Sequence, residues 1–153
     1  ELVPGATIAF KDMALSILPH LLTTSAKKNH VKNEIVILTA TSGDTGKAAL
    51  AGFADVENTR IVVFYPKGGV SPIQEKQMVT QKGDNTFVVG IKGNFDQAQS
   101  GVKAIFGNKE LAKEMDEKGL STFLAPGRPG DLARPRRQEI FACLNRCRNL
   151  KFR

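Results

Sequence analysis

The chain has 153 residues, of which 41% are hydrophobic, so it can build one ordinary core, and its length suggests one domain. It contains no uncharged apolar run of about 18 residues and begins without the basic and apolar regions of a secretory signal, so we expect a cytoplasmic protein with no membrane partner. Its net charge of +7 is compatible with nucleic-acid binding, but residues 1–119 hold 13 Lys and one Arg against 13 acids and are therefore nearly neutral. We expect nucleic acid to bind only non-specifically, through the basic residues 120–153.

The first predicted element is a helix from about Asp12 to Lys28, preceded by Lys11 in the stretch TIAFKDMAL. Composition alone favours a lysine whose side chain extends along the helix end towards water. The apolar residues around Lys11 raise another possibility, because an amine held against apolar surface is shifted towards its neutral, nucleophilic form. Schiff-base chemistry requires that form, so Lys11 is a candidate catalytic residue.

A buried strand is predicted at residues 34–41, followed by the turn SGDTG and an alanine-rich helix. A glycine-rich turn that leads into a helix exposes N–H groups and the positive end of the helix dipole, so it can bind a carboxylate or a phosphate. The spacing of Gly43 and Gly46 matches neither a P-loop nor a GxGxxG motif. A tight turn that uses glycine for geometry alone remains the alternative.

Strands and helices alternate through the next part of the chain. Two further strands are predicted at residues 60–66 and 85–91, and helices within residues 71–83, 93–106 and 109–119. Ser71 and Gln74 have the spacing of a capping box, which Asn94 and Gln97 repeat, and Gly119 is a typical helix stop. Strands joined by helical crossovers predict an α/β fold with a parallel sheet, whose ligand site lies beyond the carboxyl ends of the strands.

Residues 120–153 differ from the rest in composition. They hold seven of the eight arginines, three prolines and both cysteines of the chain. We predict a basic, Pro/Arg-rich tail, and we favour a reading-frame change, splice alternative or fusion scar over a natural linker. Cys143 and Cys147 form a CxxxC pair without a nearby histidine, which is a weak zinc signal, so we predict no metal site.

The motifs are more specific in combination than singly. TIAFKDMAL, ATSGDTGKAAL, YPKGGVSPIQEKQM and IKGNFDQAQ, in this order over about residues 5–119, resemble threonine synthase, a pyridoxal-phosphate enzyme of fold type II, the tryptophan-synthase-β-like fold. The resemblance implies that Lys11 carries pyridoxal 5'-phosphate as an internal aldimine and also acts as the catalytic base. It implies that Phe10 and Asp44 also contact the cofactor.

The resemblance also implies a substrate and its site. Threonine synthase converts O-phosphohomoserine and water to threonine and phosphate. The turn formed by Ser42, Gly43, Asp44, Thr45 and Gly46 would receive the α-carboxylate of O-phosphohomoserine. Lys67 and Asn94 are weaker candidates for contacts to the phosphate group, because both residue types are also common in solvated turns.

The members of that family are several hundred residues long, and a glycine-rich cradle for the cofactor phosphate is not recognisable in this sequence. We therefore interpret residues 1–119 as an α/β subdomain from a threonine synthase, joined to a tail unrelated to the family, and expect no turnover from the fragment alone. The alternative is a non-catalytic truncated product that acts as a binding module, with its tail contacting polyanions.

Overall fold

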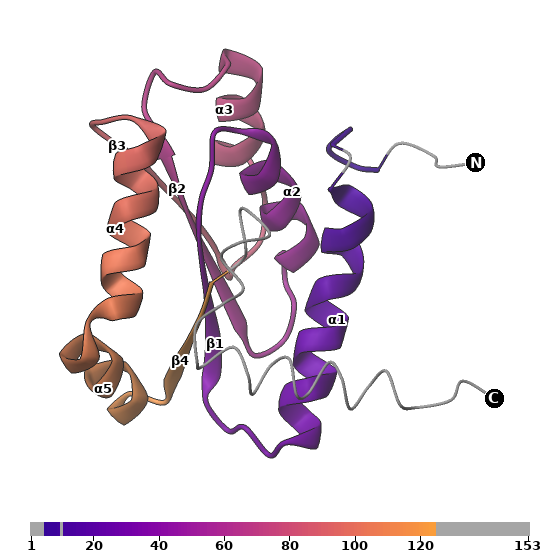
Figure 1. Cartoon of the computed structure of the whole chain (residues 1–153). Helices are drawn as coiled ribbons and strands as arrows, with labels where there is room; N and C mark the ends of the chain where they lie inside the picture. The colour runs from indigo at the N-terminus through magenta and orange to yellow at the C-terminus, as the bar shows by residue number, and fades with distance from the viewer. Residues whose placement is uncertain (1–4, 10, 125–153) are drawn as a thin grey trace.

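The structure, a computed structural model, describes residues 5–9 and 11–124. Its elements follow the chain in this order: α1 (Asp12–Lys28), β1 (Glu34–Ala40), α2 (Asp44–Phe53), β2 (Thr59–Pro66), α3 (Pro72–Val79), β3 (Thr86–Ile91), α4 (Phe95–Gly107), α5 (Lys109–Glu117) and β4 (Leu120–Leu124) (Figure 1). The first eight elements have the type and approximate position predicted from the sequence. The ninth, β4, was not predicted.

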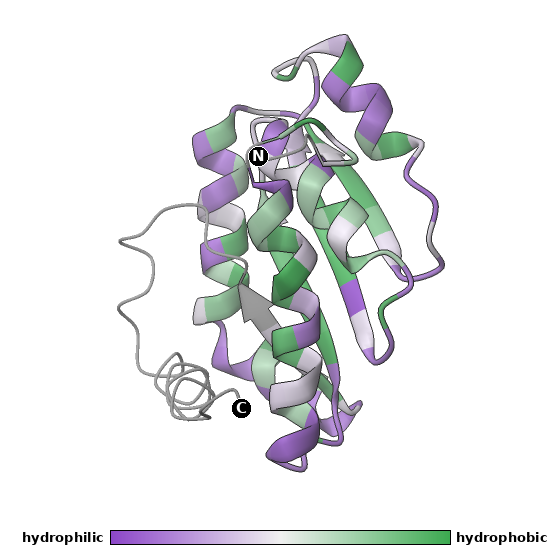
Figure 2. Ribbon diagram, turned by 90° about the vertical axis from the view of Figure 1, so that its right-hand side faces the viewer, coloured by the Kyte–Doolittle hydropathy of each residue, from purple (hydrophilic) through white to green (hydrophobic). Residues whose placement is uncertain are grey.

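The strands form one parallel sheet in the order β3-β2-β1-β4. The predicted α/β class with helical crossovers is therefore confirmed. β1 lies between β2 and β4 and is buried along its five inner residues, which explains why its sequence is a continuous apolar, β-branched run rather than an alternating one. Figure 2 shows hydrophobic residues concentrated along the strands.

Helices cover both faces of the sheet. On one face α1, α2 and α3 pack on a core that includes Leu22, Phe53, Ile37 and Met78, all of them buried. On the other face α4 and α5 pack on a smaller cluster, which is built around Val102. Figure 1 shows the two groups of helices on opposite sides of the sheet, with α4 and α5 on the left.

The sheet extends beyond the division that we predicted at Gly119. Leu120–Leu124 pair in parallel with β1, in a register that runs from Glu34 opposite Leu120 to Leu38 opposite Leu124. Five residues with a mixed pattern, LSTFL, carry too little local signal to identify a strand, because their stability comes from pairing with a strand more than 80 positions earlier. Residues 125–153, including both cysteines, lie outside the described residues.

The predicted helix boundaries follow from local capping. Ser71 accepts a hydrogen bond from the Gln74 N–H and the Gln74 side chain accepts one from the Ser71 N–H, so the capping box of α3 is confirmed. The second box, formed by Asn94 and Gln97 at the start of α4, is confirmed in the same way. Gly119 follows α5 with a φ of +70°, as expected of a glycine helix stop.

α1 is held against α2 at a glycine. A Cβ atom added to Gly52 of α2 would lie 2.4 Å from the backbone oxygen of Leu15 in α1. The two helices therefore approach each other more closely than any side chain at this position would permit. This contact fixes the start of α1, and with it the position of Lys11. No helix among the described residues is long and apolar enough to cross a membrane.

Candidate active site

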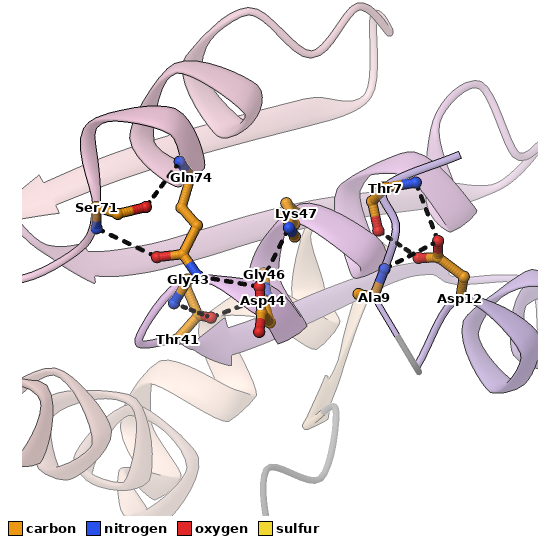
Figure 3. Close-up of polar contacts among 10 residues, drawn as sticks. All are labelled: Thr7, Ala9, Asp12, Thr41, Gly43, Asp44, Gly46, Lys47, Ser71 and Gln74. Carbon is orange, nitrogen blue, oxygen red and sulfur yellow. Dashed lines mark hydrogen bonds and ion pairs between the residues drawn. The ribbon is translucent and has the colours of Figure 1, made fainter. Parts of the chain in front are cut away.

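The loop that follows β1 is organised by a buried threonine. The Thr41 Oγ1 atom accepts hydrogen bonds from the N–H groups of Gly43, at 2.9 Å, and Gly46, at 2.8 Å. These two bonds fold residues 42–46 back over the end of the strand, so that α2 begins at Asp44 (Figure 3). The predicted turn thus lies at the carboxyl edge of the parallel sheet, where ligands bind in this fold class.

Both glycines of the loop are required by its geometry. Gly43 has a φ of +132°, and a Cβ there would come within 2.4 Å of the Gln74 side chain. A Cβ on Gly46 would come within 2.4 Å of the Thr41 side chain and 2.9 Å of Val63. The purely structural interpretation of these glycines is therefore valid, because both are required by close packing and their N–H groups already donate to Thr41.

Lys11 ends beside this loop. Its Nζ atom donates a hydrogen bond to Thr45 Oγ1 at 2.7 Å, and its side chain is half-buried. Thr45 lies 34 positions further along the chain. The structure therefore brings together the two motifs that the sequence analysis singled out, and it does so with the lysine amine pointing into the first turn of α2.

The apolar residues near Lys11 in sequence differ widely in their exposure. Ile8 is 80% exposed and Met13 is 60% exposed, while Leu15 is buried at 8%. Residues three and four positions apart lie on the same face of a helix, so Leu15 shares the face of Lys11 and Met13 does not. That apolar residues enclose the amine stays a prediction, because Phe10 lies outside the described residues.

Asp12 shapes the segment that leads into α1. Its carboxylate accepts hydrogen bonds from the Thr7 N–H at 2.9 Å, from the Thr7 hydroxyl, and from the Ala9 N–H at 3.4 Å (Figure 3). Burial raises the pKa of Asp12, but the hydrogen bonds from Thr7 and Ala9 and the charge of Lys47 outweigh it, so the pKa lies below its ordinary value. The ionised carboxylate thus holds residues 7–9 in a turn immediately before Lys11.

Asp44, at the start of α2, has two partners on one oxygen atom. Its Oδ1 atom accepts a hydrogen bond from Gln74 Nε2 at 2.9 Å and lies 3.1 Å from Lys47 Nζ. The hydrogen bonds from Gln74 and Lys47, together with the charges of Lys47 and Lys11, hold the pKa of Asp44 below its ordinary value. The candidate site therefore contains one fixed carboxylate among two lysines.

The sequence analysis missed Lys47 and the second role of Gln74. Lys47 is 9% exposed, so an ammonium is buried beside the loop and its charge is balanced by Asp44. The available signal was the spacing of three between Asp44 and Lys47 on one helix, which allows an ion pair. Nothing local in the sequence indicates that Gln74 reaches a residue 30 positions earlier.

The predicted carboxylate site is only partly available to a ligand. Ser42 and Asp44 are exposed and Thr45 is half-buried, whereas Gly43 and Gly46 are buried and already donate to Thr41. The first N–H groups of a helix have no partner within the helix. An anion at the start of α2 would therefore be bound by the N–H groups of the first turn rather than by all five residues of the loop.

The remaining candidates for phosphate contacts follow the carboxyl ends of β2 and β3. Lys67 is exposed, and its N–H donates to the Ile91 oxygen at 3.0 Å, while the Asn94 side chain caps α4. Phe10 lies outside the described residues.

Comparison with known proteins connects this arrangement to one enzyme. Threonine synthase from Saccharomyces cerevisiae is 40% identical over 117 residues, which cover 72% of this chain and 23% of the relative. The Pseudomonas aeruginosa enzyme is 43% identical over 113 residues, covering 74% of this chain and 24% of the relative. The chain therefore resembles a fragment of threonine synthase, and it spans about a quarter of the length of these relatives.

Solved structures agree with the sequence comparison. The structure of threonine synthase with bound PLP from Brucella melitensis matches with a TM-score of 0.69 and 36% identity, over 79% of this chain and 25% of that one. The yeast threonine synthase structure matches with a TM-score of 0.66 and 37% identity, over 77% and 23%. The fold is therefore that of a segment of the pyridoxal-phosphate enzymes of fold type II.

A further comparison involves the end of the chain. The family model described as MRB1590 C-terminal domain matches residues 88–153. This range includes most of β3 and all of α4, α5 and β4, together with the residues outside the described part. It covers less than half of the chain. None of the comparisons supports the alternative interpretation of the chain as a separate binding module.

Proposed function

We propose that this chain carries the lysine and the carboxylate-binding loop of a threonine synthase, and that the parent reaction converts O-phosphohomoserine and water to threonine and phosphate with pyridoxal 5'-phosphate. One observation carries the proposal: the 2.7 Å hydrogen bond between Lys11 Nζ and Thr45 Oγ1 joins the two motifs that this chemistry needs at one point. The similarity to threonine synthases over about three quarters of the chain supports it.

The residues present fit the cofactor's attachment point. Lys11 Nζ is a half-buried amine at the edge of the glycine loop, where it donates a hydrogen bond to Thr45 Oγ1 at 2.7 Å. When bound, pyridoxal phosphate supplies an electron sink for charge that develops on the substrate. Lys11 would hold the cofactor and, once released from it, carry a proton to and from the substrate α-carbon.

The loop would orient the substrate. N–H groups in the first turn of α2, at Asp44 and Thr45, would bind the α-carboxylate with the support of the helix dipole. Ser42, Gly43 and Gly46 complete the loop in this proposal, and Asp44 also faces the cofactor. Because Asp44 is held by Gln74 and Lys47, its own negative charge is partly balanced before an anionic substrate arrives.

The test is the identity of the lysine that pyridoxal phosphate occupies. Borohydride reduction of the 153-residue chain mixed with the cofactor, followed by peptide mapping, should place the label on the peptide that holds Lys11. Lys11→Ala should remove the label, whereas Lys28→Ala, a change of an exposed lysine at the other end of α1, should leave it in place. A label shared among Lys27, Lys28 and Lys32 would contradict the proposal.

A further inference from the structure

The side chain of Gln74 connects the start of α3 to the first turn of α2. Its Oε1 atom accepts a hydrogen bond from the Ser71 N–H at 3.2 Å, which completes the capping box of α3. Its Nε2 atom donates to Asp44 Oδ1 at 2.9 Å, in the first turn of α2 (Figure 3). One amide thus uses its acceptor end for its own helix and its donor end for the candidate active site.

Packing at Gly43 gives a second, independent link. A Cβ atom on Gly43 would lie between 2.4 and 2.7 Å from the three terminal atoms of Gln74. The amide therefore lies directly over the backbone of the loop, at the residue whose φ of +132° defines its path. Hydrogen bonding and contact both restrain the loop from the side of α3.

The capping box of α4 provides an internal comparison. Gln97 accepts from the Asn94 N–H at 2.9 Å, just as Gln74 accepts from Ser71. In the described part of the chain, however, the Gln97 side chain forms its hydrogen bond within its own capping box, whereas Gln74 also reaches a residue 30 positions away. The donor end of Gln74 is therefore not needed for capping.

We propose that Gln74 is a positioning residue that holds the Ser42–Gly46 loop in the conformation that binds the substrate carboxylate. This inference rests on the proposed function for the identity of the ligand, but not for the coupling between α3 and the loop. Gln74 acts through Asp44 and Gly43. By fixing the Asp44 side chain from the α3 side, it keeps the first turn of α2 turned towards Lys11.

An amide is suited to this role because it both accepts and donates. A carboxylate at position 74 could still cap α3 but would meet Asp44 as a second acceptor with a like charge. Exchanging the two groups restores the match: with Gln74→Glu and Asp44→Asn together, the amide stands at 44 and the carboxylate at 74. In the wild-type structure Lys47 Nζ lies 3.1 Å from Asp44 Oδ1, and in the double variant the carboxylate at position 74 remains close to this lysine.

The experiment compares these variants in the 153-residue chain by amide NMR, with the Gly43 and Gly46 resonances as the readout. Gln74→Glu should shift both resonances, and Gln97→Glu, which keeps the other capping box, should leave both unchanged. The double variant Gln74→Glu/Asp44→Asn should return them towards the wild-type positions. Equal shifts in the two single variants, no shift in either, or no recovery in the double variant would overturn the proposal.

A neutral pair of variants covers the case in which Gln74→Glu does not fold. Gln74→Met and Gln97→Met both remove a cap acceptor, but only the first removes the bond to Asp44. The Gly43 and Gly46 resonances should move in Gln74→Met alone, and borohydride labelling of Lys11 should fall about fivefold or more, the equivalent of one hydrogen bond. The NMR readout needs no cofactor, so a failure of Lys11 labelling in the wild-type chain would count against the proposed function and not against the role of Gln74.

Discussion

The closest approach of α1 and α2 gives the sharpest test of how Lys11 is placed. Substituting Gly52 with Ala puts a methyl group 2.4 Å from the backbone oxygen of Leu15. A backbone atom cannot rotate away as a side chain can, so α1 must shift along or away from α2. Gly101 in α4 is the matched control, because a Cβ there meets nothing within 4 Å.

The two substitutions should change the free energy of unfolding in opposite directions. Alanine is favoured over glycine inside a helix by about 0.5–1 kcal/mol, and both positions gain this term. Overpacking costs about 1–3 kcal/mol, and only Gly52→Ala incurs it. We therefore expect Gly101→Ala to raise the free energy of unfolding by about 0.5–1 kcal/mol and Gly52→Ala to lower it by up to about 2.5 kcal/mol.

Urea unfolding followed by far-UV circular dichroism measures both values. Borohydride labelling of Lys11 should also fall in Gly52→Ala and not in Gly101→Ala, because a displaced α1 moves the amine away from Thr45. Two variants that are stabilised equally would show that the Leu15 carbonyl does not restrain the helix pair, and the explanation given for the position of Lys11 would then be wrong.

Three further predictions concern the loop, the core and the sheet edge. The pKa of Asp44 lies below its ordinary value of 3.8, so the ionised carboxylate stabilises the fold above that pH, and this stabilisation is lost as the pH falls through the lower folded pKa. In urea unfolding measured as a function of pH, Asp44→Asn should reduce the loss of stability at acid pH. The hydrogen bond to Glu75, burial and the Glu75 charge raise the pKa of Tyr65, the one tyrosine in the sequence. The midpoint of its ultraviolet titration should therefore lie above 10.0 and should decrease in Glu75→Gln. The stability that this interaction provides should be lost as the pH rises through the folded pKa. A chain ending at residue 124 should keep the urea midpoint of the sheet, whereas one ending at residue 119 should unfold at lower urea because β1 loses a paired strand; equal midpoints would show that β4 contributes nothing.

The fold was predictable where signals are local. The capping boxes at Ser71 and Asn94 identify the starts of two helices from four consecutive residues each. The continuous apolar, β-branched run of β1 indicates a strand that is buried on both faces. The alternation of such strands with helices is enough to predict a parallel sheet, because each helix connects two parallel strands. β4 escaped prediction because its five residues are identified as a strand only by their pairing with β1.

The residues of the candidate site were also predictable only where their signal in the sequence is local. Lys11 and the glycine loop were recognisable because their residue types and order resemble a known enzyme, and the structure adds the 2.7 Å contact between them. The bridge from Gln74 to Asp44 joins two helices across 30 residues, and no spacing rule indicates it. Lys47 was not predicted, although it is buried and forms the ion pair that balances the charge of Asp44.

The position of Lys11 and its chemical state depend on different surfaces. Its position is determined by the contact at Gly52, which lies within the described residues. Met13, Ile17 and Leu21, spaced by four on α1, form an apolar stripe that is 60%, 53% and 39% exposed, but this stripe lies on a different face of the helix from Lys11 and does not desolvate its amine. The neutral amine that Schiff-base chemistry needs is favoured only when apolar surface excludes water. We therefore expect Lys11 labelling to change with substitutions at Gly52 and not with covering of the Met13, Ile17 and Leu21 stripe.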